Sequence, residues 1–248
     1  MYKTLHGLVL REVKYKESSK ILTILTEEEG KITAEARGAL RKGSRITAAT
    51  QLLTYSDMTI FENRGRRTLN EASTVEEFLG LRADLGAFAL GSYFAELLET
   101  VSAEEYPDPP VLQLGLNSLY ALSRALCPPE QIKAVFELRL MCLAGYEPDL
   151  SCCARCGAPE PAEPWLSLRG GAVYCAQCRG ASSSAVTPLL PETLAAMRHV
   201  VNADPKRIFS FTLGDAGLRQ LARVCEEYTA MQLERGFASL DYWKKVKD

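Results

Sequence analysis

Residues 153–178 read CARCGAPEPAEPWLSLRGGAVYCAQC, a stretch that begins and ends with a Cys-x-x-Cys pair. The pairs are Cys153 with Cys156 and Cys175 with Cys178, and eighteen residues separate them. Each pair directs two sulfur atoms toward one point, and two pairs at this spacing are typical of a structural Zn²⁺ site. Because four thiolates leave no coordination position for water or substrate, we expect one structural zinc ion that does no chemistry.

Three alternatives to this zinc site are open. A pairing of Cys152 with Cys156 has a three-residue spacing that fits the usual turn less well, so Cys153 is the preferred ligand. Disulfides are the second alternative, but residues 1–6 lack the long apolar run of a secretory signal, and a cytoplasmic, reducing setting favours metal. A site that has lost its metal is the third, and the intact set of four cysteines argues against it.

The charge is distributed unevenly along the 248 residues. The net charge is −2 overall, but residues 1–70 hold thirteen Lys and Arg against eight Asp and Glu. The remaining residues, 71–248, hold sixteen against twenty-three. A basic N-terminal module is therefore joined to an acidic C-terminal body, and a basic module is suited to polyanions such as nucleic acid.

Short apolar runs broken by turns dominate the first seventy-four residues. They predict five strands, at Leu5–Val13, Ser19–Thr26, Lys31–Ala36, Gln51–Glu62 and Arg67–Ala72. Gly30 lies between the second and third runs at a hairpin position. Five strands with loops of uneven length favour a small Greek-key barrel of the OB type, with an SH3-like barrel as the alternative.

Beyond Thr74 the apolar residues recur with helical periodicity. They predict helices at Leu85–Val101, Val111–Leu126, Glu130–Ala144, Pro191–Val201 and Asp215–Glu234. The fold class expected is therefore an α+β multidomain chain: an OB-type β-barrel at residues 1–74 and a helical domain at 75–148 and 188–248. A four-cysteine zinc-binding insert at residues 149–187 interrupts the helical domain.

Enzymatic motifs are scarce in this chain. There is no Gly-x-x-x-x-Gly-Lys phosphate loop, no Gly-x-Gly-x-x-Gly turn and no His-Glu-x-x-His pair. The two histidines, His6 and His199, are far apart in sequence, and both are interpreted as packed or surface residues. A zinc-dependent nuclease is disfavoured because four thiolates leave the metal no open position, so no catalytic residue is expected.

Basic residues are concentrated in two parts of the predicted barrel. Both are candidate DNA contacts, and a solvated, charged loop is the alternative. The first group is well placed, because the loops beside the second and third strands of an OB barrel can follow a phosphate backbone, whereas the second group lies in a turn between two later strands. The first group is Lys31, Arg37, Arg41, Lys42 and Arg45, and the second is Arg64, Arg66 and Arg67.

The residues from Gly7 to Leu22 read GLVLREVKYKESSKIL, and Ala36-Arg37-Gly38-Ala39-Leu40-Arg41 follows them. This pattern resembles the N-terminus of the bacterial RecO family of DNA repair proteins. The helices interrupted by Leu143–Pro148 and then by Cys-x-x-Cys resemble the helical domain of the same family with its zinc insert. The resemblance covers nearly the whole chain.

The resemblance implies a recombination mediator without enzymatic activity. Such a protein binds single- and double-stranded DNA, anneals complementary strands, and works with RecR and single-strand-binding protein to help load RecA. It would be cytoplasmic and associated with the nucleoid. The resemblance carries over Arg37, Arg41, Lys42 and Arg45 as DNA contacts and the four cysteines as zinc ligands. A rival of another class is a protein-only adaptor, in which the helical and zinc modules bind partners and the barrel is structural.

Overall fold

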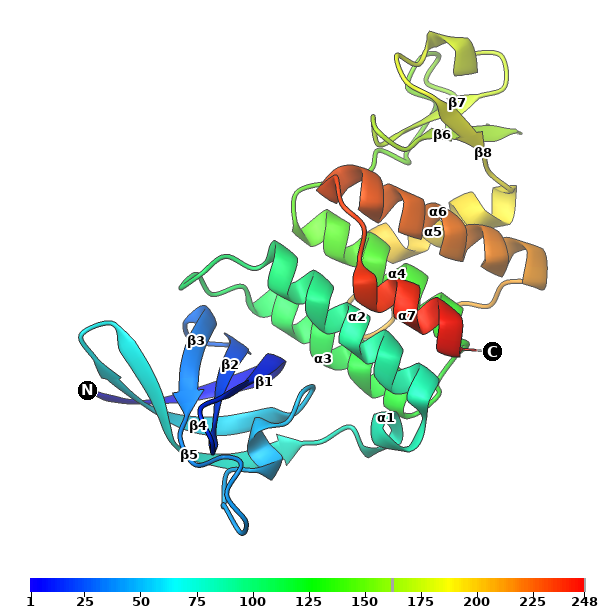
Figure 1. Cartoon of the computed structure of the whole chain (residues 1–248). Helices are drawn as coiled ribbons and strands as arrows, with labels where there is room; N and C mark the ends of the chain where they lie inside the picture. The colour runs from blue at the N-terminus through cyan, green and yellow to red at the C-terminus, as the bar shows by residue number, and fades with distance from the viewer. Residues whose placement is uncertain (162, 248) are drawn as a thin grey trace. The chain divides into compact units, whose positions relative to one another are not determined.

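A computed structural model describes residues 1–161 and 163–247 of the chain (Figure 1). It contains two compact units. The first comprises Met1–Arg124 together with Phe237–Asp248, and the second comprises Ala125–Gly236. The three-part division expected from the sequence, with boundaries after residues 74, 148 and 187, stays a prediction.

The first unit begins with a closed five-stranded barrel, which confirms the OB-type barrel expected from the sequence. Its strands follow one another around the barrel in the order β1-β2-β3-β5-β4, and only β3 and β5 pair in parallel. The strands are β1 (Tyr2–Tyr15), β2 (Ser19–Thr26), β3 (Gly30–Ala36), β4 (Tyr55–Asn63) and β5 (Arg66–Glu76). The 3-10 turn η1 (Ala48–Thr50) precedes β4.

Three strands differ from the expected limits by two residues or more. β5 ends at Glu76 rather than Ala72, because it continues to pair with β4 as far as Tyr55. β1 is longer than expected at both ends, because residues 2–4 pair with β4 and residues 14–15 continue the hairpin with β2. β4 begins at Tyr55 rather than Gln51, because residues 51–54 form a turn in which Leu53 has a φ of 63°. This left-handed backbone is incompatible with a continuous strand.

Alternation along the strands directs one set of apolar side chains into the barrel. The enclosed core includes Leu5, Val9, Leu22, Ile24, Ile32, Met58, Ile60 and Leu69. Gly30 occupies the turn before β3 with a φ of 67°, and a Cβ there would lie 2.1 Å from the carbonyl oxygen of Tyr106. Only glycine therefore allows residues 103–106 to pass so close to the barrel.

Helix α2 (Leu85–Val101) covers part of the barrel's outer surface. Leu8, Leu10 and Leu25 point outward from β1 and β2, yet they are 0–3% exposed, because α2 contacts both strands. Ion pairing adds to this contact, since Arg11 Nη2 lies 2.9 Å from Glu99 Oε1. The chain itself thus occupies the outer surface of β1 and β2, where an OB-type barrel could otherwise receive a ligand.

Three more helices complete the first unit: α1 (Leu79–Ala83), α3 (Pro109–Ser123) and α7 (Ala238–Val246). Asp84 and Asp108 begin α2 and α3 by accepting hydrogen bonds from the backbone N–H groups of Ala87 and Val111. Helix α7 packs against α2, so a segment distant in sequence belongs to this unit. Neither α1 nor α7 was predicted from the sequence.

The second unit consists of three helices and a small sheet. The helices are α4 (Pro129–Leu143), α5 (Pro191–Asn202) and α6 (Asp215–Leu233), and α4 and α6 contact each other extensively. Between α4 and α5 lie β6 (Pro164–Ser167), β7 (Ala172–Cys175), η2 (Arg179–Ala181) and β8 (Val186–Pro188). The strands form an antiparallel sheet in the order β7-β6-β8, and β8 is a strand that was not predicted from the sequence.

Candidate nucleic-acid interface and metal centre

The loop after β3, residues 37–45, carries four of the predicted DNA contacts and is called the basic loop. Arg37, Arg41, Lys42 and Arg45 are all exposed. Buried Ala39 and Ile46 anchor the loop to the barrel core, and turn hydrogen bonds shape the rest, such as Arg41 N–H to the Gly38 carbonyl at 3.0 Å. The loop therefore presents its charges from a defined backbone.

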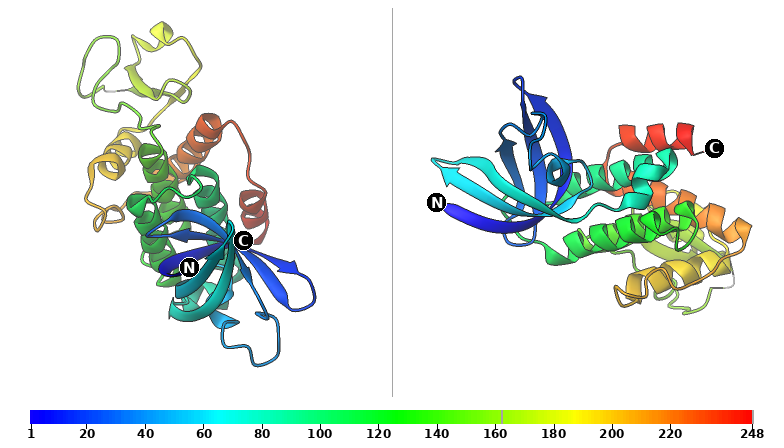
Figure 2. Two further views of the ribbon diagram at one scale, coloured as in Figure 1. Left: turned by 90° about the vertical axis from the view of Figure 1, so that its left-hand side faces the viewer. Right: turned by 90° about the horizontal axis from the view of Figure 1, so that it is seen from below.

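The tip of the β1–β2 hairpin lies beside the basic loop. The backbone N–H of Leu40 donates to the carbonyl of Ser18 at 3.0 Å, which joins the two segments. The hairpin adds Lys14 and Lys16, both exposed, and Tyr15, which is 41% exposed. Lys16 Nζ lies 4.8 Å from the centre of the Tyr15 ring. In Figure 2 these two segments are the blue projections of the barrel.

Together the basic loop and this hairpin tip form a surface that we call the loop interface. Its six cations are Lys14, Lys16, Arg37, Arg41, Lys42 and Arg45, and the carboxylates among them are Glu17 and Glu35. Arg37 lies 3.3 Å from Glu35 but keeps 67% of its side chain exposed. The excess of four positive charges and the exposed Tyr15 ring can bind phosphates and stack on a base.

Lys14, Tyr15 and Lys16 were not among the residues predicted to bind DNA. The signal that could have found them is the Lys-Tyr-Lys triplet at the end of a strand. The strand expected from the sequence ended at Val13, and nothing in the sequence shows that β1 continues past the barrel to Tyr15.

Lys31 and Arg67 form hydrogen bonds and ion pairs within the first unit. Lys31 Nζ donates to the Glu99 carbonyl at 2.8 Å and lies 3.6 Å from Glu104 Oε1. Arg67 is only 13% exposed in its side chain, with Glu105 at 2.8 Å and Glu29 at 3.6 Å. Both cations therefore attach the segment after α2 to the barrel, and their role as DNA contacts stays a prediction.

Arg64 and Arg66 lie apart from the loop interface, in the β4–β5 hairpin that Figure 1 shows in cyan. Both are exposed. The hairpin is next to the start of β1, because Tyr2 pairs with Phe61, whereas the loop interface is at the other end of β1. The structure thus does not bring the two predicted basic groups together.

The four predicted zinc ligands converge on one point. The Sγ atoms of Cys153, Cys156, Cys175 and Cys178 all lie within 4.8 Å of one another, and Cys152 is not part of this four-cysteine cluster. Each pair sits in a tight turn: the N–H of Gly157 donates to the Cys153 carbonyl at 2.8 Å, and that of Cys178 to the Cys175 carbonyl at 3.0 Å. The cluster could hold a metal ion.

The surroundings of Cys153 suit a thiolate ligand. Burial alone would raise the pKa of Cys153, but backbone N–H groups of Cys156, Cys175 and Arg155 lower that pKa to about 6. A lowered thiol pKa favours the ionised sulfur that metals bind. The fit of donor type, number and spacing supports a closed, four-coordinate site.

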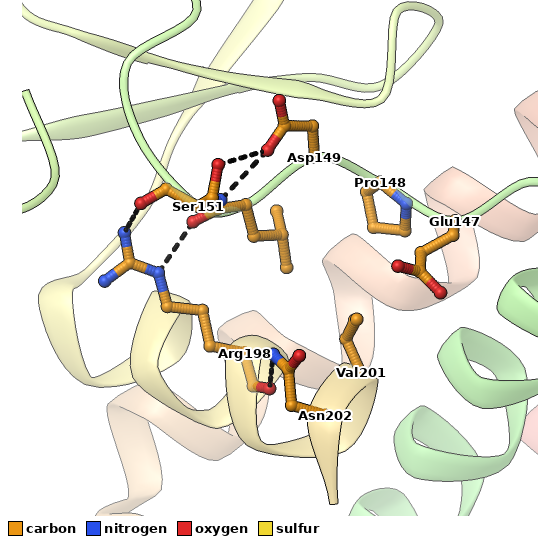
Figure 3. Close-up of a pocket in the computed structure, with 8 residues that line it drawn as sticks. Glu147, Pro148, Asp149, Ser151, Arg198, Val201 and Asn202 are labelled. Carbon is orange, nitrogen blue, oxygen red and sulfur yellow. Dashed lines mark hydrogen bonds between the residues drawn. The ribbon is translucent and has the colours of Figure 1, made fainter. Parts of the chain in front are cut away.

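Within the second unit, Arg198 of helix α5 binds the first residues of the cysteine-containing insert (Figure 3). Its guanidinium donates to the carbonyls of Leu150 at 2.7 Å, Ser151 at 3.1 Å and Pro159 at 2.7 Å, and to Glu160 Oε1 at 2.8 Å. It forms one wall of an open pocket of about 480 Å³ whose other residues include Glu147, Asp149 and Asn202. These bonds hold the start of the insert in place against α5.

Four cysteines lie outside the four-cysteine cluster: Cys152, described above, and Cys127, Cys142 and Cys225. Cys225 is fully buried, and burial raises the pKa of Cys127 to about 11 and that of Cys142 to about 12. Protonated thiols are poor nucleophiles and poor metal ligands, so these three side chains are suited to packing rather than to chemistry.

No helix in the described part of the chain has the length and apolar character needed to cross a bilayer.

Comparisons with known proteins give the same family over both parts of the chain. Residues 1–78 match the family model described as Recombination protein O N terminal, and residues 82–241 match the model described as Recombination protein O C terminal. Curated relatives named DNA repair protein RecO include one from Acetivibrio thermocellus, 32% identical over 97% of this chain and 95% of its own.

Two further relatives carry the same name. The Heliobacterium modesticaldum protein is 34% identical over 89% of this chain and 81% of its own. The Exiguobacterium sibiricum protein is 34% identical over 90% of this chain and 88% of its own. The chain contains the barrel, the helices and the four-cysteine cluster expected from the sequence, and family models match both of its parts. It therefore belongs to the RecO family of DNA repair proteins.

Proposed function

We propose that this protein is a recombination mediator that binds single- and double-stranded DNA and anneals complementary strands. In this role it would help RecA load on DNA coated with single-strand-binding protein, together with RecR, in the cytoplasm and in association with the nucleoid. The observation that carries the proposal is the loop interface, where six cations and an exposed tyrosine face solvent. Family membership supports the same role.

The proposal includes no catalytic step. We propose a Zn²⁺ ion at the four-cysteine cluster, held by Cys153, Cys156, Cys175 and Cys178. Four thiolates would occupy every position of a tetrahedral ion, so the metal would stabilise the insert without activating water. DNA binding would instead depend on phosphate contacts from Arg37, Arg41, Lys42 and Arg45, with Lys14 and Lys16 beside them and Arg64 and Arg66 at the other hairpin.

The decisive test is the salt dependence of binding to single-stranded DNA. Changing Arg37, Arg41, Lys42 and Arg45 together to Ala should weaken binding and flatten the plot of log affinity against log salt. The slope should fall by about 0.7 for each phosphate that the variant no longer neutralises. Fluorescence anisotropy of a labelled oligonucleotide between low and moderate salt measures both quantities.

A control removes positive charge from the exposed side of a helix instead. Arg219→Ala with Arg223→Ala takes two exposed cations from α6 and should leave affinity and slope unchanged. If the loop variant keeps the slope and affinity of the wild type, the assignment of the loop interface is wrong.

A protein-only adaptor is the second candidate function. It is favoured by one observation, that α2 covers the outer surface of β1 and β2 and so gives this part of the barrel a structural role. The adaptor predicts no mobility shift of a short oligonucleotide at low salt, whereas the mediator predicts a clear shift. One such measurement separates the two.

A further inference from the structure

The barrel also carries a pair of adjacent aromatic rings, far from Tyr15. Tyr2 of β1 and Phe61 of β4 are cross-strand partners whose ring centres lie 4.9 Å apart. Since Met58 and Ile60 point into the barrel core, strand alternation places Phe61 on the outer surface. Tyr2 is 61% exposed. Two adjacent rings on an outer surface offer π-faces on which bases of any sequence can stack.

Two exposed arginines follow these rings closely in the sequence. Arg64 and Arg66 belong to the β4–β5 hairpin directly after Phe61, and both are exposed. Neither has an ion pair among the residues that the structure describes. The nearby carboxylates are already engaged, since Lys3 Nζ lies 2.5 Å from Glu29 and 2.9 Å from Glu62.

We call this surface, made of Tyr2, Phe61, Arg64 and Arg66, the hairpin interface. Its exposed guanidinium groups and apolar ring faces match the two parts of a single strand, the phosphates and the bases. Neutral partners would gain nothing from the two arginines, and acidic peptides would gain little from adjacent ring faces. The chemistry therefore favours single-stranded nucleic acid.

The hairpin interface is not continuous with the loop interface. The two lie at opposite ends of β1, a strand of 14 residues, which at about 3.3 Å per residue spans on the order of 40 Å along its path. A phosphate backbone that followed β1 would first meet a group of carboxylates. Glu28 lies 2.5 Å from His6 Nδ1, and Asp57 lies 3.5 Å from His6 Nε2.

Beyond His6, the same path is closed by the chain itself. Leu8 and Leu10 of β1 are buried under α2, as described above. Repulsion by Glu28 and Asp57 and then the covering helix leave no positively charged track between the two surfaces. One strand cannot easily occupy both of them along β1.

We infer that the barrel binds two single strands at once, one on the loop interface and one on the hairpin interface. This inference rests on the proposed function and extends it to the way in which annealing is promoted. Two strands held on one barrel meet at an effective concentration set by the barrel's size, which for short tethers is in the millimolar range. Their pairing then no longer depends on the concentration of free strands.

The test is the number of short strands that one chain binds. An oligonucleotide of roughly eight thymidines is short enough to occupy one site only. In a fluorescence titration at a protein concentration far above the dissociation constant, the wild type should bind two per chain. A hairpin variant with Tyr2→Ser, Arg64→Ala and Arg66→Ala should bind one, a loop variant with Arg37→Ala, Arg41→Ala, Lys42→Ala and Arg45→Ala should bind one, and the combination should bind none.

The variants are chosen to leave the fold intact. Phe61 is kept because it is half-buried, and Arg64→Ala with Arg66→Ala alone gives a second, milder form that should weaken only one of the two binding steps. Circular dichroism confirms folding of each variant. The control with Arg219→Ala and Arg223→Ala should still bind two strands.

The outcomes separate the two proposals. A wild type that binds a single oligonucleotide, lost in the loop variant alone, would overturn the second site and leave the proposed function standing. Two oligonucleotides that are both retained in the hairpin variant would also overturn it. A wild type that binds none would instead refute DNA binding itself, and the inference would fall with it.

Discussion

Lys133 is a charged residue inside the second unit, with only 2% of its side chain exposed. Its Nζ lies 2.9 Å from Glu137 in the same helix and 2.9 Å from Glu226 of α6. Burial alone would lower the pKa of Lys133, but the two carboxylates raise it above the ordinary value, so the ammonium stays charged. One side chain thereby links α4 to α6.

Lys133→Met tests this link. The substitution removes the ammonium from the fully buried carboxylate of Glu137, so we expect a loss of about 3–5 kcal/mol in the free energy of unfolding of the second unit. Urea unfolding followed by circular dichroism measures the loss. Adding Glu137→Met should restore most of it, because an apolar pair avoids the buried charge. A single variant as stable as the wild type would contradict the role given to Lys133.

At the scale of elements, the cysteine insert is held by two kinds of contact. The four-cysteine cluster joins its two turns, and Arg198 ties its first residues to α5. The sheet of β6, β7 and β8 has short strands of three or four residues, and so small a sheet buries too little apolar surface to be stable alone. The metal is therefore expected to supply most of its stability.

Metal removal should unfold the insert and leave the barrel folded. Structural zinc can contribute on the order of 10 kcal/mol to the folding of a small module. Elemental analysis should find one zinc per chain, and Cys153→Ser with Cys175→Ser should abolish it. Hydrogen exchange of the double variant should then show fast exchange in residues 164–188 and unchanged protection in β2 and β3. Zinc retained at full stoichiometry would mean that other residues bind it.

The elements that could be predicted from the sequence are those whose side chains repeat with a clear period. Helix α2 and strands β2 and β3 were predicted to within one residue because apolar residues mark each of them. The turn at Leu53 was missed, since a left-handed φ of 63° is uncommon for a residue other than glycine and nothing in the sequence marks it. Lys31 and Arg67 appeared as free cations because their partners, Glu99 and Glu105, are distant in sequence.

At the scale of the whole molecule, sequence periodicity does not reveal the contact between the last helix and the first unit. Helix α7 returns to the first unit after the entire second unit, and it packs on α2. Trp243 is 3% exposed there and Leu240 is 6% exposed, while Phe237 meets Tyr93 edge to face with ring centres 5.6 Å apart. Only the final tertiary packing shows which unit these residues stabilise.

Trp243→Ala should therefore destabilise the first unit, although it lies almost at the other end of the chain. Removing a buried tryptophan typically costs about 3–5 kcal/mol. Thermal unfolding followed by circular dichroism measures the loss. The neighbouring Tyr242 is 50% exposed, so Tyr242→Ala is a matched control that should change stability little. Equal effects of the two substitutions would contradict the packing of α7 on α2.

The return of α7 also sets an order for folding on the ribosome. Helix α2 ends at Val101 and α7 begins at Ala238, so at 5–20 residues per second the ribosome needs roughly ten seconds to make the intervening chain. During that interval the barrel can close, but the apolar surface of α2 that α7 will cover stays open to water. The nascent protein is therefore most prone to aggregate after its barrel has formed and before its last helix emerges. In the same interval the apolar surface of α2 is open to binding by a chaperone.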